Sequence, residues 1–531
     1  MPDPTTSTIR CEDGTEINFT WVYPGAEALE WLRDESHWPE PAAPMKLRLQ
    51  EGYVRGADRA WQEAGLEPPA MFHRFQFVGP FFYAMMTPDP PERLAQIAPP
   101  YVEVAQRYGN ALGFWEQYCR PRIQQVCKDL AAMPPDAPLA QTGELSGYGF
   151  HQTFTCLVLL GLPNMFLTAL LAESVGNDAT LLAYEVTQGG ENASQLIDSE
   201  IWELAELARS APAVAQLLTS KSPEVALASL RGAPGAAAFV AAFDALVEEH
   251  GSRSQGWDIV MPTWRERPEA PLALVRAHLE SVGVSPRELA AGSAARRRDA
   301  TARALAAIPE SKHATFQQFV TQLDGYVSVR EDRAYWQMVL TGEIRGVLLR
   351  KGAVLVQSGR IDRPDDVLFL EPEEVESDNG SDLRAVVSER RRAWEHWRHV
   401  VPPPQIGTPG DMTALMAATA AATTTGELRG APASRGQVTG TARILDNPED
   451  GDHLRPGDIL VCLMTTPAWT PLFSIVSGII TETGGPLSHP AITAREYGIP
   501  AVVAVKSATT LIRDGQTITI DGAKGIITLE D

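Results

Sequence analysis

The spacing of apolar residues divides the chain into a long helical region and a shorter region of strands. From about residue 90 to residue 400, apolar residues recur at three- and four-residue intervals, as on one face of a helix. The clearest predicted helices cover residues 101–133, 237–250, 316–349 and 383–400. A short strand is predicted at residues 17–23, a Pro-rich loop at 31–45, and a loop with short extended pieces at 355–370.

The pattern changes after residue 400. Residues 401–410 are rich in Pro, and residues 413–425 are almost only Ala, Thr, Met and Leu, so residues 401–430 are predicted to be a flexible linker. After it, short β-rich runs alternate with Gly and Pro turns, at residues 436–445, 458–461, 478–481, 501–505, 517–521 and 525–529, with one helix at 490–497. The predicted fold class is multidomain α and α/β, with a mainly helical domain over residues 1–400 and a small α/β domain over residues 431–531.

Composition and charge limit the classes of molecule that the protein is expected to bind. The 531 residues are 44% apolar and 21% charged, with a formal net charge of −22. This charge argues against nucleic-acid and anionic-membrane partners and favours a small-molecule substrate that is not strongly anionic itself. Residues 155–172 carry no charge over about the minimum length of a membrane span, but Gly161 and Pro163 interrupt them. Two short buried helices joined by a bend are predicted there, and no membrane is expected.

The cysteines and the N-terminus suggest a reduced compartment. The five cysteines are scattered, and no two have the Cys-x-x-Cys spacing of a zinc or redox site. No carboxylate cluster has recognisable metal-ligand spacing either, so no metal site is predicted. Residues 1–10 are polar and lack an apolar signal region. A cytoplasmic location is therefore expected.

The densest candidate chemistry lies in residues 480–505, ITETGGPLSHPAITAREYGIPAVVAV. His489 comes directly before Pro490, a residue favoured in the first helical turn, which predicts that His489 stands at a helix N-terminus. Free backbone N–H groups and the helix dipole favour an anion at that end. Gly484 and Gly485 would let the backbone approach a tetrahedral group without a Cβ in the way.

A neutral imidazole in such a turn can attack a phosphorus centre. Ser488 could then hydrogen-bond the His489 ring or a phosphoryl oxygen, and Arg495 could anchor either the helix or the charge. The alternative is that His489 is only a helix cap in a Gly-rich turn. Spacing alone does not separate the two interpretations.

This segment resembles the phosphohistidine signature of the phosphoenolpyruvate-utilising enzymes, which include the rifampicin phosphotransferases. The matching positions are Thr483, the two glycines, Ser488–His489 and residues 494–503. Residues 433–443, 456–460 and 514–522 resemble the rest of the swivelling domain, and the resemblance covers residues 431–531. Residues 37–39, 249–253, 257–264, 330–336 and 359–370 resemble, more weakly, the substrate-binding part of rifampicin phosphotransferase-type proteins. The resemblance implies a substrate-binding domain at 1–400 and a swivelling phosphohistidine-type domain at 431–531.

The chain also departs from that family's pattern. Family members commonly have His at the position of Ser252 and Ala at the position of Pro490, and Pro490 removes one N–H from the helix start. No ATP-grasp domain, phosphoenolpyruvate barrel or Gly-rich loop with Walker spacing is evident. ATP and Mg²⁺ are therefore expected to act through a separate ATP-grasp partner, as in the split subunits of phenylphosphate synthase.

Several residues of the helical region are candidates for the substrate site. Arg330 and Arg333 are three apart on a predicted helix, where they could clamp a phosphoryl group or simply pair with neighbouring carboxylates. Arg253 and Asp258 flank a Gly/Ser loop, so they could line a pocket or form a buried ion pair. His37 and His151 could contact substrate.

His151 is a candidate general base, although both histidines could instead be hydrogen-bonded core residues.

Two functions from different classes follow. The first is a phosphotransferase component in which His489, assisted by Arg330, relays a phosphoryl group from a separate ATP-dependent partner to a small, aromatic or apolar hydroxyl-bearing substrate. The second is a lyase, dehydratase or isomerase in which His489 is itself the general acid or base. A third, non-enzymatic alternative is a phosphocarrier, which the large helical region disfavours.

Overall fold

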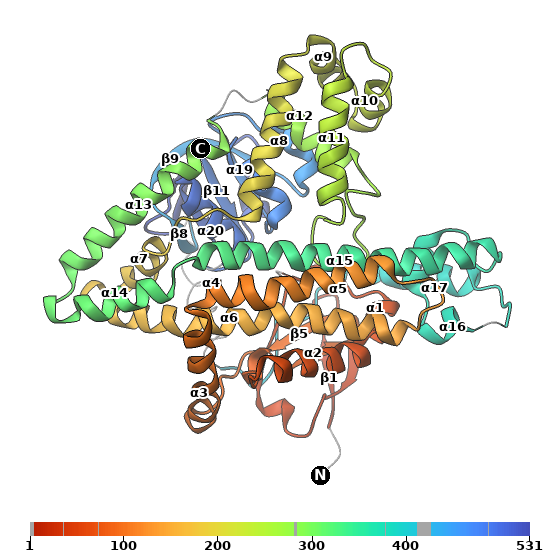
Figure 1. The fold of residues 1–531 in the computed structure, drawn as a ribbon, viewed down its shortest axis with the longest axis horizontal. Coiled ribbons are helices and arrows are strands. Elements are labelled where there is room, and N and C mark those ends of the chain that lie inside the picture. Colours follow the sequence, from red (N-terminus) through yellow and green to blue (C-terminus); the bar gives the residue numbers. More distant parts are fainter. Residues whose placement is uncertain are drawn as a thin grey trace.

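A computed structural model describes residues 5–35, 37–72, 74–280, 284–377, 379–410, 426–486 and 488–530. Figure 1 shows a layer of long helices with a helical lobe on one side and the small C-terminal domain next to that lobe. The long layer consists of α6 (Leu139–Val175) and α15 (Tyr326–Gln357), which run side by side with α2 (Gln50–Ala64) and α5 (Arg120–Ala132). Their apolar faces meet in one large core, in which Leu160, Leu340 and Leu348 are fully buried. The expected helical body is therefore present.

The other helices of this body surround the long layer. They are α1 (Pro44–Arg48), α3 (Pro91–Tyr108), α4 (Ala111–Phe114), η3 (Trp115–Cys119), α7 (Ala179–Glu185), α13 (Pro286–Ala307), α14 (His313–Gln322), α16 (Pro372–Glu376) and α17 (Arg384–Trp397). The helix predicted at residues 101–133 is divided among α3, α4, the π-helical turn η3 and α5. The helix predicted at residues 316–349 is divided between α14 and α15. The predicted loop at 355–370 contains the end of α15 and a 3-10 helix, η6 (Pro364–Phe369), instead of extended pieces.

The two short helices and the bend predicted within residues 155–172 are replaced by one helix, α6. It continues through Gly161 and Pro163 as one helix of 37 residues. Leu159 and Leu160 before the proline and Leu167 and Leu171 after it are buried in the same core, and this packing stabilises a continuous helix although Pro163 cannot donate a backbone hydrogen bond. Within the described residues, the segment 139–185 is the one helix long and apolar enough to cross a membrane. About half of its apolar window (47%) is buried inside the protein, as in a core helix.

Glycines allow α6 to pack very closely on α2. A Cβ added at Gly147 would lie 1.8 Å from the backbone oxygen of Tyr53, and one at Gly56 would lie 1.9 Å from that of Glu144. The two backbones are therefore in direct contact along this stripe. Because Tyr53 and Ser146 also line the cavity described below, this packing positions one of its walls.

We expect Gly147→Ala to lower the free energy of unfolding by roughly 1–3 kcal/mol, because the backbone of Tyr53 leaves no room for the methyl group. Gly161→Ala is the matched control on the same helix, since its Cβ would meet nothing within 4 Å. That change should leave stability equal or raise it by up to about 1 kcal/mol. Chemical denaturation of the two variants checks this; equal midpoints would show that the stripe does not limit α2–α6 packing.

Two small sheets lie at the N-terminal side. β1 (Thr6–Arg10) and β2 (Glu16–Thr20) form a hairpin, while a four-stranded antiparallel sheet has the order β4 (Phe75–Val78), β5 (Phe81–Met85), β3 (Glu30–Arg33), β6 (Gln405–Gly407). The predicted loop at 31–45 thus begins inside β3 and ends in α1. Part of the predicted linker is likewise a strand, because β6 pairs with β3. Residues 411–425 of that linker lie outside the described residues.

The C-terminal domain is an α/β unit, as expected. Its eight-stranded sheet has the order β7-β14-β13-β9-β10-β11-β12-β8, with β9 to β12 parallel at the centre and antiparallel strands outside them. Short helices α19 (Thr470–Phe473), α20 (His489–Tyr497) and α21 (Ala508–Leu511) pack on it. The strands are β7 (Glu427–Arg429), β8 (Ala431–Ser434), β9 (Gln437–Ile444), β10 (Ile459–Cys462), β11 (Gly478–Thr481), β12 (Ala501–Val503), β13 (Thr517–Asp521) and β14 (Ile526–Leu529).

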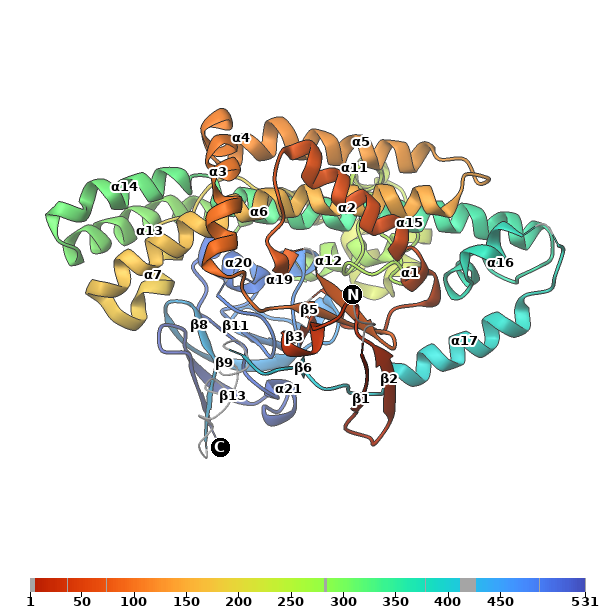
Figure 2. The same cartoon turned by 90° about the horizontal axis from the view of Figure 1, so that it is seen from below.

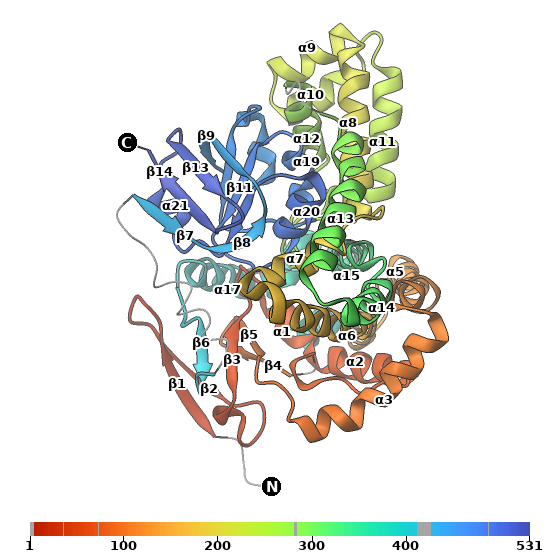
Figure 3. The ribbon, with the colours of Figure 1, turned by 90° about the vertical axis from the view of Figure 1, so that its left-hand side faces the viewer.

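This domain shares a core with the helical lobe. The lobe consists of α8 (Ala193–Arg209), α9 (Pro212–Ser220), α10 (Pro223–Leu230), α11 (Ala237–His250) and α12 (Glu269–Glu280). Figure 3 shows α19 and α20 facing this lobe. Leu272 and Val275 of α12 belong to the same buried cluster as Leu472 and Phe473 of α19. The C-terminal domain is therefore docked on the helical region.

Candidate functional site

His489 lies where the two regions meet. It is the first residue of α20, as predicted, and its imidazole faces the long helix α15. Its Nδ1 lies 2.9 Å from Oε2 of Glu331, and its Nε2 lies 3.2 Å from Oγ1 of Thr470. The side chain is only 6% exposed. Both ring nitrogens are thus held by specific polar partners in this docked arrangement.

Glu331 fixes the state of the ring. Its carboxylate is buried in α15 and also accepts a hydrogen bond of 3.0 Å from the Ser194 hydroxyl. Burial raises its pKa, but His489, Ser194 and nearby Arg330 outweigh burial and hold the pKa below its ordinary value. An ionised carboxylate accepts the proton of Nδ1, which leaves the lone pair of Nε2 as the nucleophile or base of the neutral ring. The Thr470 hydroxyl can donate to that lone pair.

The turn before α20 is built as its glycines suggest. Gly484 adopts a φ of +101°, which side-chain-bearing residues rarely adopt, and Gly485 has open space at its Cβ position. Ser488 donates to the carbonyl of Gly485 (2.7 Å), so in this state it bonds neither the ring nor an anion. Arg495 donates to the carbonyls of Ala433 and Pro486 at 2.7 and 2.8 Å. It therefore anchors the turn and the helix, which is one of its two expected roles.

Polar contacts fix the docked orientation of the C-terminal domain. Arg435 pairs with Asp178 and Glu185 at 2.5 and 2.6 Å. The Tyr497 hydroxyl donates to buried Asp198 at 2.6 Å. Glu496, at the end of α20, accepts from the Ser293 hydroxyl and from the backbone of Gly189. These contacts place α20, and with it His489, at one position on the helical region.

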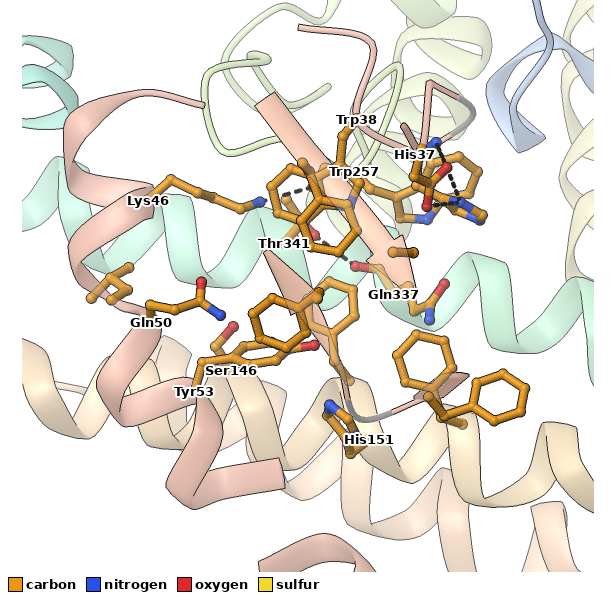
Figure 4. A pocket seen from close by; sticks show the side chains of 18 of the residues that line it. His37, Trp38, Lys46, Gln50, Tyr53, Ser146, His151, Trp257, Gln337 and Thr341 are labelled. Atoms are coloured by element: carbon orange, nitrogen blue, oxygen red, sulfur yellow. Dashed lines mark hydrogen bonds and ion pairs between the residues drawn. The ribbon is translucent and has the colours of Figure 1, made fainter. Parts of the chain in front are cut away.

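A cavity of about 230 Å³ opens beside α15 (Figure 4). Arg333, Gln337, Thr341 and Ile344 of α15 form one wall, and the other walls come from α1, α2, α6, β4, β5 and the 257–259 loop. Nine of the other lining residues are aromatic: Trp38, Tyr53, Phe72, Phe75, Phe77, Phe82, Phe150, Phe154 and Trp257. A rigid aromatic cavity with a few polar groups suits a small aromatic or apolar molecule.

Trp257 connects this cavity to the docked domain. Its ring packs against Ala334 and Met338 of α15 and against Ala468, two residues before Thr470. It also contacts the ring of His37, with centroids 5.0 Å apart. One side chain therefore separates the cavity from the segment that contacts His489.

The two cavity histidines have opposite hydrogen-bonding states. His37 directs Nδ1 at both oxygens of Asp34, at 3.0 and 2.9 Å, and among the described residues its Nε2 has no hydrogen-bond partner. His37 can therefore accept a proton at Nε2 while Asp34 stabilises the charged ring. His151 is buried, and its Nδ1 accepts a 2.8 Å hydrogen bond from Nε1 of Trp61. The neutral His151 ring thus carries its proton on Nε2, which makes it a donor, not a base.

The four remaining candidate residues have different surroundings. Arg333 lines the cavity, where burial and neighbouring Arg330 lower its pKa to about 9, and its Nε has no partner among the described residues. Arg330 is half-buried, with its guanidinium 5.8 Å from the ring centre of Tyr326, and it acts electrostatically on both Arg333 and Glu331.

Arg253 and Asp258 are buried and do not line this cavity. The guanidinium of Arg253 lies 4.7 and 5.7 Å from the ring centres of Trp264 and Tyr335. Asp258 accepts a hydrogen bond from the backbone of Val260. Atoms of both side chains lack a hydrogen-bond partner within the described part of the chain, and a role for the two residues in the site stays a prediction.

Sequence reasoning missed several groups of the site. Glu331 was considered only as a partner of its arginine neighbours, and Thr470, Asp34 and Lys46 carried no motif. Asp34 is three residues before His37, which was the one local signal for their pairing.

Spacing also indicated no metal cluster. The fold nevertheless brings ligand atoms of Glu200, Glu249 and His250 within 4.8 Å of one another, outside the cavity.

Two family models match the chain. Residues 153–331 match the rifampicin phosphotransferase fourth domain, and residues 454–525, which include the His489 turn, match the mobile domain of the PEP-utilising enzymes. Each of these two parts of the chain is therefore similar to a domain of the PEP-utilising or rifampicin phosphotransferase type. The helical region and the His489 domain are thus similar to two parts of one kind of protein, as the sequence resemblance implied.

Curated relatives agree with this assignment. The chain is 33% identical to a rifampicin phosphotransferase of a Streptomyces species over 64% of the chain and 40% of the relative, and 30% identical to that of Bacillus cereus over 66% and 41%. It is 28% identical to the chondramide synthase cmdD of Chondromyces crocatus over 97% of the chain and 14% of the relative. The chain spans less than half the length of each of these relatives.

Proposed function

We propose that this chain is the acceptor part of a phosphotransferase. His489 would take a phosphoryl group from a separate ATP-dependent partner and pass it to the hydroxyl of a small aromatic or apolar substrate in the aromatic cavity. The observation that carries the proposal is the position of His489. Its Nδ1 is held by Glu331 of α15, and Arg333, two residues further along that helix, lines the cavity. The relatives named rifampicin phosphotransferase support the reaction class.

The first step loads the carrier. Nε2 of His489 forms an N–P bond while the P–O bond to the donor's leaving group breaks, and the leaving oxygen keeps the electron pair. The ring then carries a proton on Nδ1 and a positive charge, which the Glu331 carboxylate would stabilise in the docked position. Because Nε2 is buried against Thr470 here, loading requires His489 to leave this position. ATP and Mg²⁺ would act at the donor.

The second step unloads the carrier. The substrate oxygen attacks phosphorus, the N–P bond breaks, and its electrons return to Nε2 of His489. The hydroxyl proton goes to Nε2 of His37, whose positive charge Asp34 stabilises. Arg330 and Arg333, next to Glu331 on α15, are placed to neutralise the phosphoryl oxygens.

Direct acid–base catalysis by His489 is the alternative, and the Glu331–His489 pair would be its dyad. The cavity lining does not include His489, so a lyase substrate would have to bind elsewhere or after a rearrangement. The same rearrangement is needed for phosphoryl transfer, and the relatives named rifampicin phosphotransferase favour the phosphotransferase.

The test uses the full chain and phosphoramidate, a small-molecule phosphoryl donor that reacts with imidazole. We expect intact-mass analysis to show one added phosphoryl group, labile in acid and stable in base, at His489. ATP alone should leave the mass unchanged, because the chain has no loop of Walker spacing. Turnover of an aromatic hydroxy compound in the absence of any phosphoryl donor would instead support the lyase.

A further inference from the structure

The charged groups in the cavity have the opposite sign to the chain as a whole. The protein carries a net charge of −22, yet three basic residues, Lys46, Arg74 and Arg333, line the cavity against one carboxylate, Asp34. Asp34 is already bonded to His37. The lining therefore has an excess of two positive charges, although the net charge of the whole chain favours a substrate that is not anionic.

The three basic groups are not equivalent. Arg74 is exposed and stacks on Tyr23, with its Nη1 3.0 Å from the Tyr23 hydroxyl, so it lies toward solvent. Arg333 is 7% exposed and lies on α15, near Glu331 and His489. Lys46 comes from α1, a different wall, and Figure 4 shows it extending into the cavity toward Trp38.

Lys46 contacts an aromatic ring and a backbone carbonyl. Its Nζ lies 3.6 Å from the ring centre of Trp38 and 3.4 Å from the carbonyl oxygen of Trp257. Among the described residues it forms no ion pair with a carboxylate. Burial lowers its pKa to about 8, and the charge of Asp258 partly opposes this. An ammonium group in an aromatic wall without a direct ion pair is costly, and a bound anion would offset that cost.

We infer that the cavity binds an aromatic carboxylate, with the substrate's carboxylate at Lys46 and its ring among the aromatic walls. This inference rests on the proposed function, since it names the class of acceptor: a hydroxyl-bearing aromatic acid. Gln50 and Ser146, which line the cavity as well, could supply neutral hydrogen-bond donors for the same carboxylate. His37 remains available for the hydroxyl.

Binding to the full chain tests the inference without any phosphoryl transfer. Calorimetry, or the fluorescence of Trp38 and Trp257, would compare 3-phenylpropanoate with 3-phenylpropanamide, which has nearly the same shape and no charge. We expect the acid to bind about tenfold or more tightly than the amide, as for a charge-assisted hydrogen bond in a cavity. Lys46→Met should abolish that preference and leave the affinity for the amide within about twofold.

Two variants serve as controls. Lys46→Arg keeps the charge and should keep most of the preference, while Lys524→Met, which removes an exposed lysine paired with Asp521 in the C-terminal domain, should change nothing. His489→Ala should bind both compounds normally, so that failure of phosphoryl transfer and failure of this inference are distinguishable.

Equal affinities for acid and amide, no binding of the acid, or a preference that survives Lys46→Met would overturn the inference. Competition by inorganic phosphate that is lost in Lys46→Met would also overturn it, because Lys46 would then serve the transferred phosphoryl group and not the substrate's own carboxylate.

Discussion

His489→Ala should remove all phosphoryl label from the chain and abolish turnover. In the proposed reaction the imidazole forms the N–P bond, and alanine has no atom that can replace Nε2. Even if His489 acted only in proton transfer, the loss would be about two to four orders of magnitude. Intact-mass analysis after phosphoramidate treatment and product formation with an aromatic hydroxy acid check the two parts of this expectation.

His453→Ala is the matched control for this experiment. His453 lies in the same domain, but its side chain is 73% exposed, and its Nε2 lies 3.6 Å from Oδ1 of Asp452. Labelling and turnover should survive its loss. The fold should also survive His489→Ala, at a cost of about 1–3 kcal/mol because buried Glu331 loses a hydrogen-bond partner. A folded His489→Ala protein that still turns over would exclude both the phosphotransferase and the acid–base alternative.

Local signals predicted the C-terminal domain well. Strands β11 (Gly478–Thr481) and β13 (Thr517–Asp521) have the predicted bounds, because each is a short apolar run between Gly or Pro turns. The position of His489 at a helix start also followed from adjacent residues. In contrast, Pro163 predicted a bend in α6 that packing on both sides overrides. Local propensity decides a structure only where tertiary contacts do not oppose it.

The cavity could not be predicted in the same way. Its lining comes from residues 34–86, 146–154, 257–259 and 333–344, and no periodicity relates segments so far apart. The role of Glu331 was hidden for the same reason, since its partner His489 is 158 residues away. The net charge of −22 also misleads here, because a sum over the chain does not give the sign of one cavity. Adjacent residues thus point to His489 as a candidate reactive group, whereas the lining of the cavity depends on contacts between distant segments.

In the proposed reaction, the Glu331–His489 and Asp34–His37 pairs have different roles. Glu331 holds Nδ1 of His489, and Asp34 holds Nδ1 of His37, so both rings keep Nε2 as the reactive atom. One pair lies at the docked C-terminal domain and the other at the cavity, and Trp257 contacts both His37 and the cluster that includes Ala468. A reaction with separate loading and unloading steps therefore has a distinct group for each.

His37→Ala should consequently slow the transfer from His489 to the substrate hydroxyl by about two to four orders of magnitude while leaving the labelling of His489 unchanged. Asp34→Asn should have a similar effect, because an amide N–H donated to Nδ1 would leave the proton on Nε2 and remove its lone pair. The measurement is the single-turnover loss of label from phosphorylated chain mixed with 3-(4-hydroxyphenyl)propanoate.

His151→Phe provides the contrast, since His151 lines the same cavity but carries its proton on Nε2. Its loss should weaken substrate binding and leave the rate at saturating substrate within about tenfold, because no proton acceptor is removed. If His151→Phe stopped transfer and His37→Ala did not, the roles assigned from the two tautomers would be reversed. If both variants transferred normally, the hydroxyl would lose its proton to a group outside the cavity, and the Asp34–His37 pair would be only a structural feature of its rim.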